Sequence, residues 1–245
     1  NVIWSKTYGG PDIDVAKSVQ QTLDSGYIIA GYTNSFGSQG VYLIRTDANG
    51  DTLWTKIFGT LFVPELPNSV FQTFDGGYII AATTDTGFGG SKIVLIKTDA
   101  GGDALWTKIF SNMVDFGNAG FSAQQTIDSG YIISGITSGG AVTNVVYLIK
   151  TDINGDTLWT RGYKLVGNNG ALRSMVLQTS DGGYIIGGVS GEPELFSSEF
   201  TYLIKVDSIG DTIWTKKYND IYAMYYSSSF MQQTADGGYI ITGHL

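Results

Sequence analysis

Nine acidic residues lie outside the repeated parts of the sequence and are the side chains best suited to acid–base chemistry. They are Asp12, Asp14, Glu65, Asp85, Asp115, Glu192, Glu194, Glu199 and Asp220. Two such carboxyl groups can hydrolyse a glycosidic bond when they lie about 5 to 9.5 Å apart. A sequence does not give that separation, and no recognisable motif surrounds any of the nine. We therefore assign no catalytic residue from the sequence.

Aromatic side chains gather in the segment that precedes the last repeat and recur in the equivalent segments of earlier repeats. Rigid aromatic rings stack on sugar faces or anchor protein interfaces at a small cost in conformational entropy. The same rings would alternatively fill the protein core. The candidate ligand-binding residues are Tyr222, Tyr225, Tyr226, Phe62, Phe116 and Asp115.

Metal and cofactor chemistry find little support in the sequence. The turn Asp47-x-Asn49-x-Asp51 resembles the start of a calcium loop, but the twelfth position, which is a carboxylate in an EF-hand, is Phe58. Asp and Asn are also typical of tight turns, where they bond to the local backbone. We favour this structural role and expect no metal site.

Nucleophilic catalysis of the common kinds is also disfavoured. The chain has no Cys, and its one histidine, His244, cannot by itself supply a His cluster or an ordinary Ser-His-Asp triad. No Gly-rich phosphate-binding loop with Lys and Ser or Thr is present. We expect neither a cofactor nor a nucleotide.

Glutamine recurs once in each period, on the strand expected to lie nearest the centre of the fold. One interpretation is a ring of side chains that binds a ligand in a central channel. The interpretation we favour is that these amides satisfy backbone groups between converging sheets. The residues are Gln21, Gln72, Gln125, Gln178 and Gln233.

The elements that must position these residues repeat about every fifty residues, a period typical of propellers and solenoids. Two independent markers keep the same register. The tryptophans are Trp4, Trp54, Trp106, Trp159 and Trp214, and the tyrosines are Tyr27, Tyr78, Tyr131, Tyr184 and Tyr239.

Each period predicts four short antiparallel strands. In the first copy these are Ser18–Thr22, Gly26–Tyr32, Val41–Arg45 and Thr52–Phe58. Hairpin turns that contain Asp, Asn or Gly join the first strand to the second and the third strand to the fourth. Alternation on the fourth strand puts Trp54 on a face that we expect to dock against the adjacent sheet. Because no useful stretch has a helical period, the sequence predicts an all-β fold.

Repeated four-stranded meanders predict a five-bladed β-propeller formed by residues 1–245 as a single domain. A solenoid is the main rival, but it would not need two tight turns in every repeat. The third strand has only four copies, and the chain opens with a fourth strand at Asn1–Tyr8. We therefore expect the N-terminal strand to close the ring and the last blade to be incomplete.

The residues Asp47 to Trp54, with the pattern D-x-N-G-x-x-x-W, resemble the tryptophan-docking repeat of quinoprotein-like propellers. The whole period is similar to repeats common in exported surface proteins of bacteria and archaea. This resemblance spans nearly the entire chain and implies the propeller fold. It implies no particular activity, because such repeats serve many functions.

The amino-acid composition limits the classes of partner that the protein could bind. The net charge of −8 and the pI near 4.5 disfavour nucleic acid, and the 14 basic residues are scattered, most of them once per repeat, which spreads charge around the body. No apolar run is long enough to span a bilayer. A surface rich in Gly, Ser, Thr, Asn and Tyr favours a secreted or cell-surface protein, and the start at Asn1 suggests a piece of a longer chain.

Together these features predict a non-enzymatic binding or adhesion module that contacts glycan or protein through its variable loops, where scaffolded binding residues tend to lie. The first alternative is a polysaccharide-degrading enzyme, a glycosidase or lyase, on a propeller scaffold. The second alternative is a structural spacer.

Overall fold

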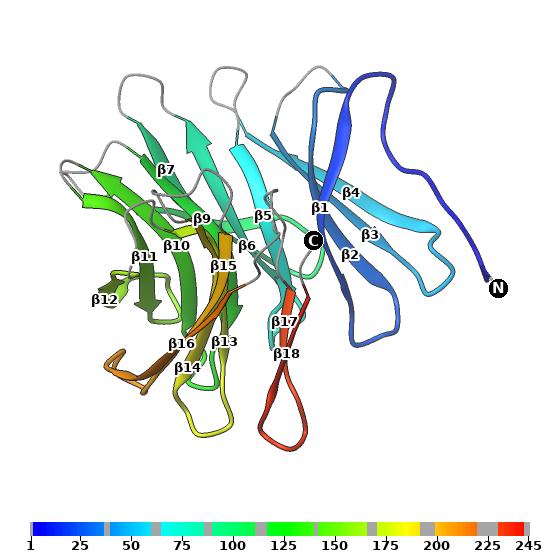
Figure 1. Cartoon of the computed structure of the whole chain (residues 1–245). Helices are drawn as coiled ribbons and strands as arrows, with labels where there is room; N and C mark the ends of the chain where they lie inside the picture. Colours follow the sequence, from blue (N-terminus) through cyan, green and yellow to red (C-terminus); the bar gives the residue numbers. More distant parts are fainter. Residues whose placement is uncertain are drawn as a thin grey trace. The chain divides into compact units, whose positions relative to one another are not determined.

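The computed structural model describes residues 2–36, 40–59, 65–85, 90–110, 117–139, 142–165, 171–191, 199–219 and 230–242. Within these residues the chain is built from β-strands joined by tight turns, as Figure 1 shows. None of the described residues forms a helix with the length and hydropathy needed to cross a membrane. The chain forms two compact units, Asn1–Ser111 and Asn112–Leu245, and each is described by itself.

The first unit contains two four-stranded meanders. Their strands are β1 (Asp14–Gln21), β2 (Tyr27–Thr33), β3 (Gly40–Thr46) and β4 (Thr52–Phe58), followed by β5 (Glu65–Gln72), β6 (Tyr78–Asp85), β7 (Ser91–Thr98) and β8 (Ala104–Phe110). In each meander, successive strands pair antiparallel in sequence order.

The second unit repeats this meander twice and ends in a two-stranded hairpin. Its strands are β9 (Gly117–Gln125), β10 (Tyr131–Gly139), β11 (Val142–Thr151), β12 (Thr157–Tyr163), β13 (Ala171–Gln178), β14 (Tyr184–Gly191), β15 (Glu199–Val206), β16 (Thr212–Asn219), β17 (Phe230–Gln233) and β18 (Tyr239–Thr242). The predicted four-stranded period is therefore confirmed in four copies.

Turn chemistry fixes the register of each meander. The first turn of the first sheet is closed by a hydrogen bond from Thr22 N to Gly26 O, and Ser25 adopts a φ of 70°. The turn between the third and fourth strands is closed from Asp47 N to Asp51 O, with Gly50 at a φ of 79°. Positive φ values are why Gly, and less often Ser, occupies these positions.

The first strand of each sheet begins earlier than the sequence predicts. Strand β1 starts at Asp14 rather than Ser18, and β5 starts at Glu65, which is the equivalent position in the second sheet. Each strand contains a bulge, between Ala16 and Ser18 in β1 and between Pro67 and Ser69 in β5. A bulge interrupts the period of two by which a strand is recognised.

Apolar residues from facing sheets form the core of each unit. In the first unit Leu43 and its neighbours from β2 and β3 pack against Tyr78, Ile80 and their neighbours from the second sheet. In the second unit a corresponding cluster joins Leu148 of β11 to Tyr184 of β14. Each sheet thus buries one face against the next one in sequence within its unit.

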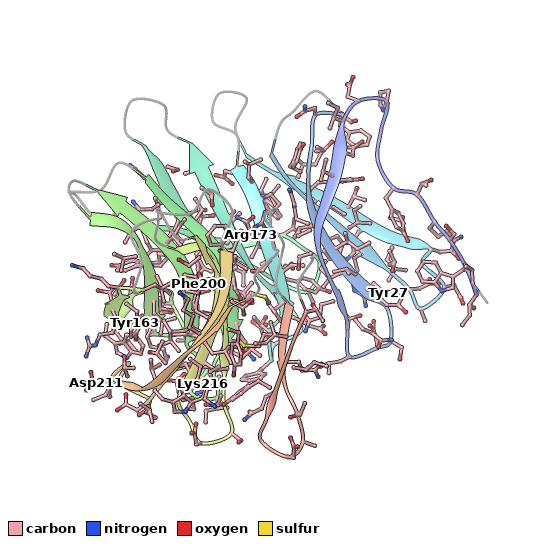
Figure 2. The ribbon with its side chains drawn as sticks, viewed as in Figure 1. Tyr27, Tyr163, Arg173, Phe200, Asp211 and Lys216 are labelled. Atoms are coloured by element: carbon pink, nitrogen blue, oxygen red, sulfur yellow. The ribbon has the colours of Figure 1, made fainter. Side chains whose placement is uncertain are left out.

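The indole rings pack against tyrosines of the following sheet. Trp54 meets Tyr78 edge to face at a centroid distance of 5.8 Å, and Trp159 meets Tyr184 at 6.0 Å. Beside Trp54 and Trp159, a cation on the same strand reaches an acid in the next sheet: Lys56 pairs with Asp103, and Arg161 pairs with Asp211, which Figure 2 labels. Edge-to-face pairs of this kind add stability beyond the area that they bury.

Residues 2–8 contact the first sheet in the way that the fourth strand of one sheet contacts the sheet that follows it. Trp4 lies edge to face with Tyr27 at 5.7 Å, Lys6 pairs with Asp51 at 2.7 Å, and the Tyr8 hydroxyl donates to Gly50 O at 2.7 Å. Tyr163, on the fourth strand β12, makes the corresponding bond to Gly210 O. Closure of a ring by this segment stays a prediction.

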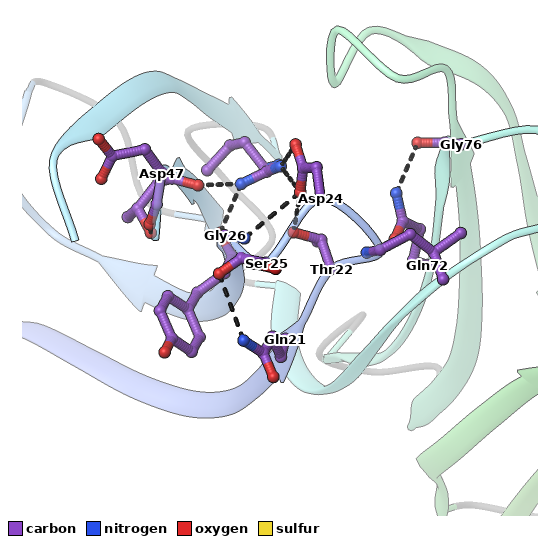
Figure 3. A network of polar contacts seen from close by, with 12 residues as sticks. Gln21, Thr22, Asp24, Ser25, Gly26, Asp47, Gln72 and Gly76 are labelled. Carbon is purple, nitrogen blue, oxygen red and sulfur yellow. Dashed lines mark hydrogen bonds and ion pairs between the residues drawn. The ribbon is translucent and has the colours of Figure 1, made fainter. Parts of the chain in front are cut away.

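One cation from each third strand is buried, so the basic residues that recur once per repeat include one in the interior of each complete sheet. Lys97 Nζ pairs with Asp75 at 2.8 Å and also donates to Thr98 O at 2.6 Å. Arg45 makes the corresponding pair with Asp24, and Figure 3 shows Asp24 at the centre of a network with Thr22 and Gly26. Because buried charges are stable only when paired, these contacts explain a basic residue in an otherwise apolar strand.

Candidate active site

Two of the nonrepeated acids occupy the same position in successive sheets. Asp14 pairs with Thr33 at the start of β1, and Glu65 pairs with Thr84 at the start of β5. The same position in the third sheet is Asn118, opposite Thr137, and in the fourth sheet it is Ala171. A position that is regular in the backbone therefore carries a carboxylate only in the first two sheets.

Strands β1 and β5 lie side by side in the first unit, so these acids belong to neighbouring strands. The Val70 N–H donates to Ser18 Oγ at 3.2 Å, and the Gln72 N–H donates to Gln20 Oε1 at 2.7 Å. Asp14 and Glu65 lie at the ends of the two strands that are remote from the hairpin turns. The two acids therefore lie at the same end of neighbouring strands.

The Asp14 carboxylate is held by groups from two segments. One oxygen accepts hydrogen bonds from the Gly10 N–H at 2.7 Å and from the Ser35 hydroxyl at 3.0 Å, while the other, Oδ1, is buried without a hydrogen-bond partner among the described residues. The neighbouring Thr33 hydroxyl, followed by the Gly10 N–H, holds the pKa of Asp14 below its usual range. Donors aimed at a carboxylate favour its ionised form.

Glu65 has the opposite electrostatic environment. Its side chain is half-buried, and burial raises the pKa of Glu65 above its usual range because desolvation penalises the charged form. Its paired residue, Thr84, is buried. At a pH between the two pKa values, the glutamic acid can therefore carry a proton while Asp14 is ionised.

Paired carboxyl groups whose surroundings move their pKa values apart are the usual arrangement for acid–base catalysis. A protonated carboxylic acid can donate to a leaving oxygen, and an ionised one can act as a base or a nucleophile. The sequence identified Asp14 and Glu65 as nonrepeated acids, but it did not indicate that they share one position of the repeat. Their shared position is seen only from the register of β1 with β2 and of β5 with β6.

The first sheet also bears an apolar cavity of about 440 Å³. Its lining includes Trp4, Tyr27, Ile29, Tyr42 and Asp14. Residues equivalent to Tyr27 and Ile29 in the second sheet pack against the sheet before it. The cavity therefore lies on the face of the first sheet that corresponds to a buried packing face of the second sheet, and the Asp14 carboxylate is part of its lining.

The repeated polar residues are engaged in structure. Gln72 Oε1 accepts the Leu23 N–H at 2.9 Å, and its amide donates to Gly76 O at 3.4 Å, as Figure 3 shows. Gln178 likewise accepts the Ile127 N–H, so the interpretation that these amides satisfy backbone groups is confirmed. In the acidic turn, Asp47 Oδ1 accepts the N–H groups of Asn49 and Asp51.

All six residues proposed as ligand-binding from the sequence lie outside the described residues. They are Tyr222, Tyr225, Tyr226, Phe62, Phe116 and Asp115. The nonrepeated acids Glu192, Glu194 and Asp220 also fall there. For these residues the sequence-based expectation stays a prediction.

Comparison with known proteins identifies structural relatives but no sequence relatives. No protein-family model matches the sequence, and no curated protein matches it. The resemblance to the tryptophan-docking repeat of quinoprotein-like propellers therefore has no support from sequence families.

Three solved structures are similar to this chain over most of its length. An endo-arabinase from Bacteroides thetaiotaomicron has a TM-score of 0.56 at 11% identity, covering 98% of this chain and 93% of that one. A protein of unknown function from Dyadobacter fermentans has a TM-score of 0.61 at 12% identity, covering 99% and 78%. A candidate exo-β-1,3-galactanase from Bifidobacterium bifidum has a TM-score of 0.51 at 13% identity, covering 81% and 69%.

These similarities contradict the expectation of a non-enzymatic binding or adhesion module, because two of the three structures are described as enzymes that act on glycans. Sequence identities this low establish the fold and not the activity. The four meanders, the absence of helix from the described residues and the structural relatives agree on one conclusion. The chain is an all-β protein of the β-propeller fold class.

Proposed function

We propose that this chain is a glycoside hydrolase that degrades polysaccharide on a propeller scaffold. The observation that carries the proposal is the pair formed by Asp14 and Glu65, which share one position on neighbouring strands and have pKa values displaced in opposite directions. Glu65 protonates the leaving oxygen of the glycosidic bond. Asp14 acts as the base that activates water or as the nucleophile.

The structural relatives support this choice of chemistry. An arabinase and a candidate galactanase share the fold, so the scaffold is compatible with cleavage of arabinose- and galactose-containing polymers. Polymeric sugars offer flat faces on which aromatic rings stack. In this proposal Phe62, Phe116 and the tyrosines Tyr222, Tyr225 and Tyr226 bind sugar units of the substrate.

We propose that the protein is exported or held at the cell surface, where it would meet an extracellular polysaccharide. The low content of charged residues, 15%, and the 34 glycines are compatible with such a protein. Detection of the native protein in culture medium or on intact cells tests this part of the proposal.

The direct test is release of reducing sugar from arabinan and from β-1,3-galactan by the purified protein. Asp14→Asn and Glu65→Gln should each lower kcat by about 10² to 10⁴-fold, the usual contribution of a general acid or base. Asp47→Asn is the matched control, since it makes the same chemical change in a turn at the opposite end of the sheet and keeps the Oδ1 acceptor. Variants that retain full activity with an intact fold would refute the assignment.

The pH profile supplies an independent test. Activity requires ionised Asp14, so it should fall only at pH values below the lowered pKa of that carboxyl. It also requires protonated Glu65, so it should fall as pH rises through the raised pKa of that residue. The Glu65→Gln variant should lose the alkaline limb of the profile. An alkaline limb that persists in this variant would exclude Glu65 as the acid.

A further inference from the structure

Ser35 lies at the centre of the contacts that hold the Asp14 carboxylate. Its hydroxyl donates to Asp14 Oδ2 at 3.0 Å and accepts the Asp12 N–H at 3.1 Å. Its own N–H donates to Thr33 Oγ1 at 3.0 Å. Ser35 and Thr33 are both 0% exposed. One buried serine therefore contacts the acid, the segment that precedes the acid, and a second hydroxyl on the strand opposite it.

The Thr33 hydroxyl is a second donor for Asp14. Thr33 is opposite Asp14 in the register of β1 and β2. A hydroxyl oxygen that accepts the Ser35 N–H keeps its own proton to donate. The Thr33 hydroxyl is first among the groups that lower the pKa of Asp14, and the Gly10 N–H and then the Ser35 hydroxyl lower it as well. Two buried hydroxyl groups and one N–H thus favour the ionised carboxylate.

Two adjacent glycines allow this close approach. Gly9 adopts a φ of 140°, and a Cβ added to it would lie 2.4 Å from Asp14 Oδ2. A Cβ added to Gly10 would lie 2.5 Å from Ser35 Cβ. Any other residue at either position would therefore displace the acid or the serine, which explains why both positions are glycine. The segment 9–13 is shaped around Asp14 and Ser35.

These contacts use one oxygen of Asp14 and leave the other. Oδ2 accepts the Gly10 N–H and the Ser35 hydroxyl, whereas Oδ1 is buried without a hydrogen-bond partner among the described residues. Unpaired buried polar atoms are rare, and a catalytic role is one of the reasons for them. A functional carboxylate must also be fixed in orientation by residues that are themselves locked in place, as Ser35 is here.

We propose that Ser35 and Thr33 are positioning residues of the active site, whose buried hydroxyl groups hold the Asp14 carboxylate in the orientation it needs as base or nucleophile. This role rests on the proposed glycosidase function. Because both side chains are fully buried, they act through Asp14 and do not contact the substrate. Loss of either hydroxyl should therefore slow the chemical step and leave substrate binding unchanged.

Three other titratable groups come from the segments around Asp14. Asp12 belongs to the same segment and gives its N–H to Ser35. Tyr42 of β3 lines the same cavity, and its pKa is raised by burial and, to a smaller degree, by the charge of Asp14. Glu65 belongs to the neighbouring strand β5. All three remain in the variants below, so a changed pH dependence in those variants reports the lost donor.

The test compares Ser35→Ala and Thr33→Val with the parent protein in the release of reducing sugar from arabinan and β-1,3-galactan at several pH values. In each variant kcat should fall about tenfold or more, the usual contribution of a hydrogen bond to a charged group, with KM unchanged. Loss of a donor raises the pKa of Asp14, so the acid limb of the profile should move to higher pH. The alkaline limb, which Glu65 sets in the proposed mechanism, should stay in place.

Each variant has a matched control. Ser134→Ala removes another hydroxyl that is 0% exposed, one that donates to Ser174 O in the second unit. Thr98→Val removes a buried hydroxyl that donates to Asp99 O at the hairpin-turn end of the second sheet. Both controls should keep the parent kcat and both limbs of the profile. An acid limb that moves in the controls as well, or in none of the variants, would overturn the proposal.

A titration that does not depend on activity separates this proposal from the proposed function. The carboxyl carbon of Asp14 is followed by ¹³C NMR and assigned by the loss of its signal in Asp14→Asn. Its pKa should rise in Ser35→Ala and in Thr33→Val. An identical titration in the parent and both variants would refute the positioning role even in an active enzyme. A parent protein that releases no sugar would instead refute the glycosidase function, and the positioning role with it.

Discussion

Replacing Asp181 by Asn isolates the charge of one buried ion pair. Asp181 Oδ1 accepts the Thr179 hydroxyl at 2.6 Å and the Gly183 N–H at 3.0 Å, and asparagine keeps an oxygen at that position. The second oxygen, 2.9 Å from Lys205 Nζ, becomes an amide group that cannot accept from the ammonium. The substitution thus keeps the turn and leaves Lys205, whose side chain is 6% exposed, without its counter-charge.

The pKa of Asp181 gives the magnitude. Hydrogen bonds from Thr179 and then from Lys205 lower this pKa from 3.8 to about 2, which corresponds to roughly 2.4 kcal/mol at 1.36 kcal/mol per unit. The carboxyl side chain is 59% exposed, so water and salt screen it. We expect Asp181→Asn to reduce the free energy of unfolding by about 1 kcal/mol at pH 6.

Urea denaturation at several pH values is the assay. A depressed pKa contributes stability above the unfolded-state value of 3.8, and that contribution is lost as pH falls from about 4 to about 2. The difference between parent and variant should therefore shrink over this window. Asp207→Asn is the control, because Asp207 Oδ1 accepts only the turn N–H groups of Ile209 and Asp211 in the described structure. A difference that stays constant down to pH 2 would show that charge is not its cause.

Three further perturbations test other parts of the structure. Trp54→Ala removes the ring that meets Tyr78 and should cost about 2 kcal/mol in urea denaturation, whereas Leu53→Ala, on the exposed face, should cost under about 0.5 kcal/mol; equal losses would mean that the indole contact adds nothing. Gly183→Ala should lower stability by about 1 to 3 kcal/mol through its clash with Val206 O, and an unchanged unfolding midpoint would show that the third strand can retreat. Replacing Tyr222, Tyr225 and Tyr226 together by Ala should raise KM for polysaccharide about tenfold or more with little change in kcat; an unchanged KM would remove these residues from the proposed site.

The architecture was predictable because two local signals agree. A period of about fifty residues carries Trp and Tyr in register, and Asp-Gly-Gly turns such as that after Thr179 demand a positive φ at Gly182, which the structure gives as 82°. Turn chemistry and strand alternation are properties of neighbouring residues. They can therefore be read without knowledge of tertiary contacts.

The shared position of Asp14 and Glu65 was not predictable by the same means. Bulges after Ala16 and Pro67 break the alternation of these strands, so neither acid falls within a strand predicted from the sequence. The buried cations were missed for a related reason. Lys97 occupies the same position of the repeat as other basic residues. Its burial is seen only in the folded sheet, where Asp75 of the first turn lies 2.8 Å from the Lys97 amine.

Each buried cation finds its counter-ion inside its own meander, as Lys205 does with Asp181 and Lys150 does with Asp128. A duplication or deletion of one whole repeat therefore adds or removes both charges together, and it leaves neither of them buried without its partner. Neighbouring meanders meet through apolar core residues, ring contacts and partly exposed pairs, and none of the buried cations named above takes its counter-ion from the adjoining copy. Such electrostatic self-sufficiency would allow the array to change its number of repeats in evolution without a compensating mutation for each buried charge.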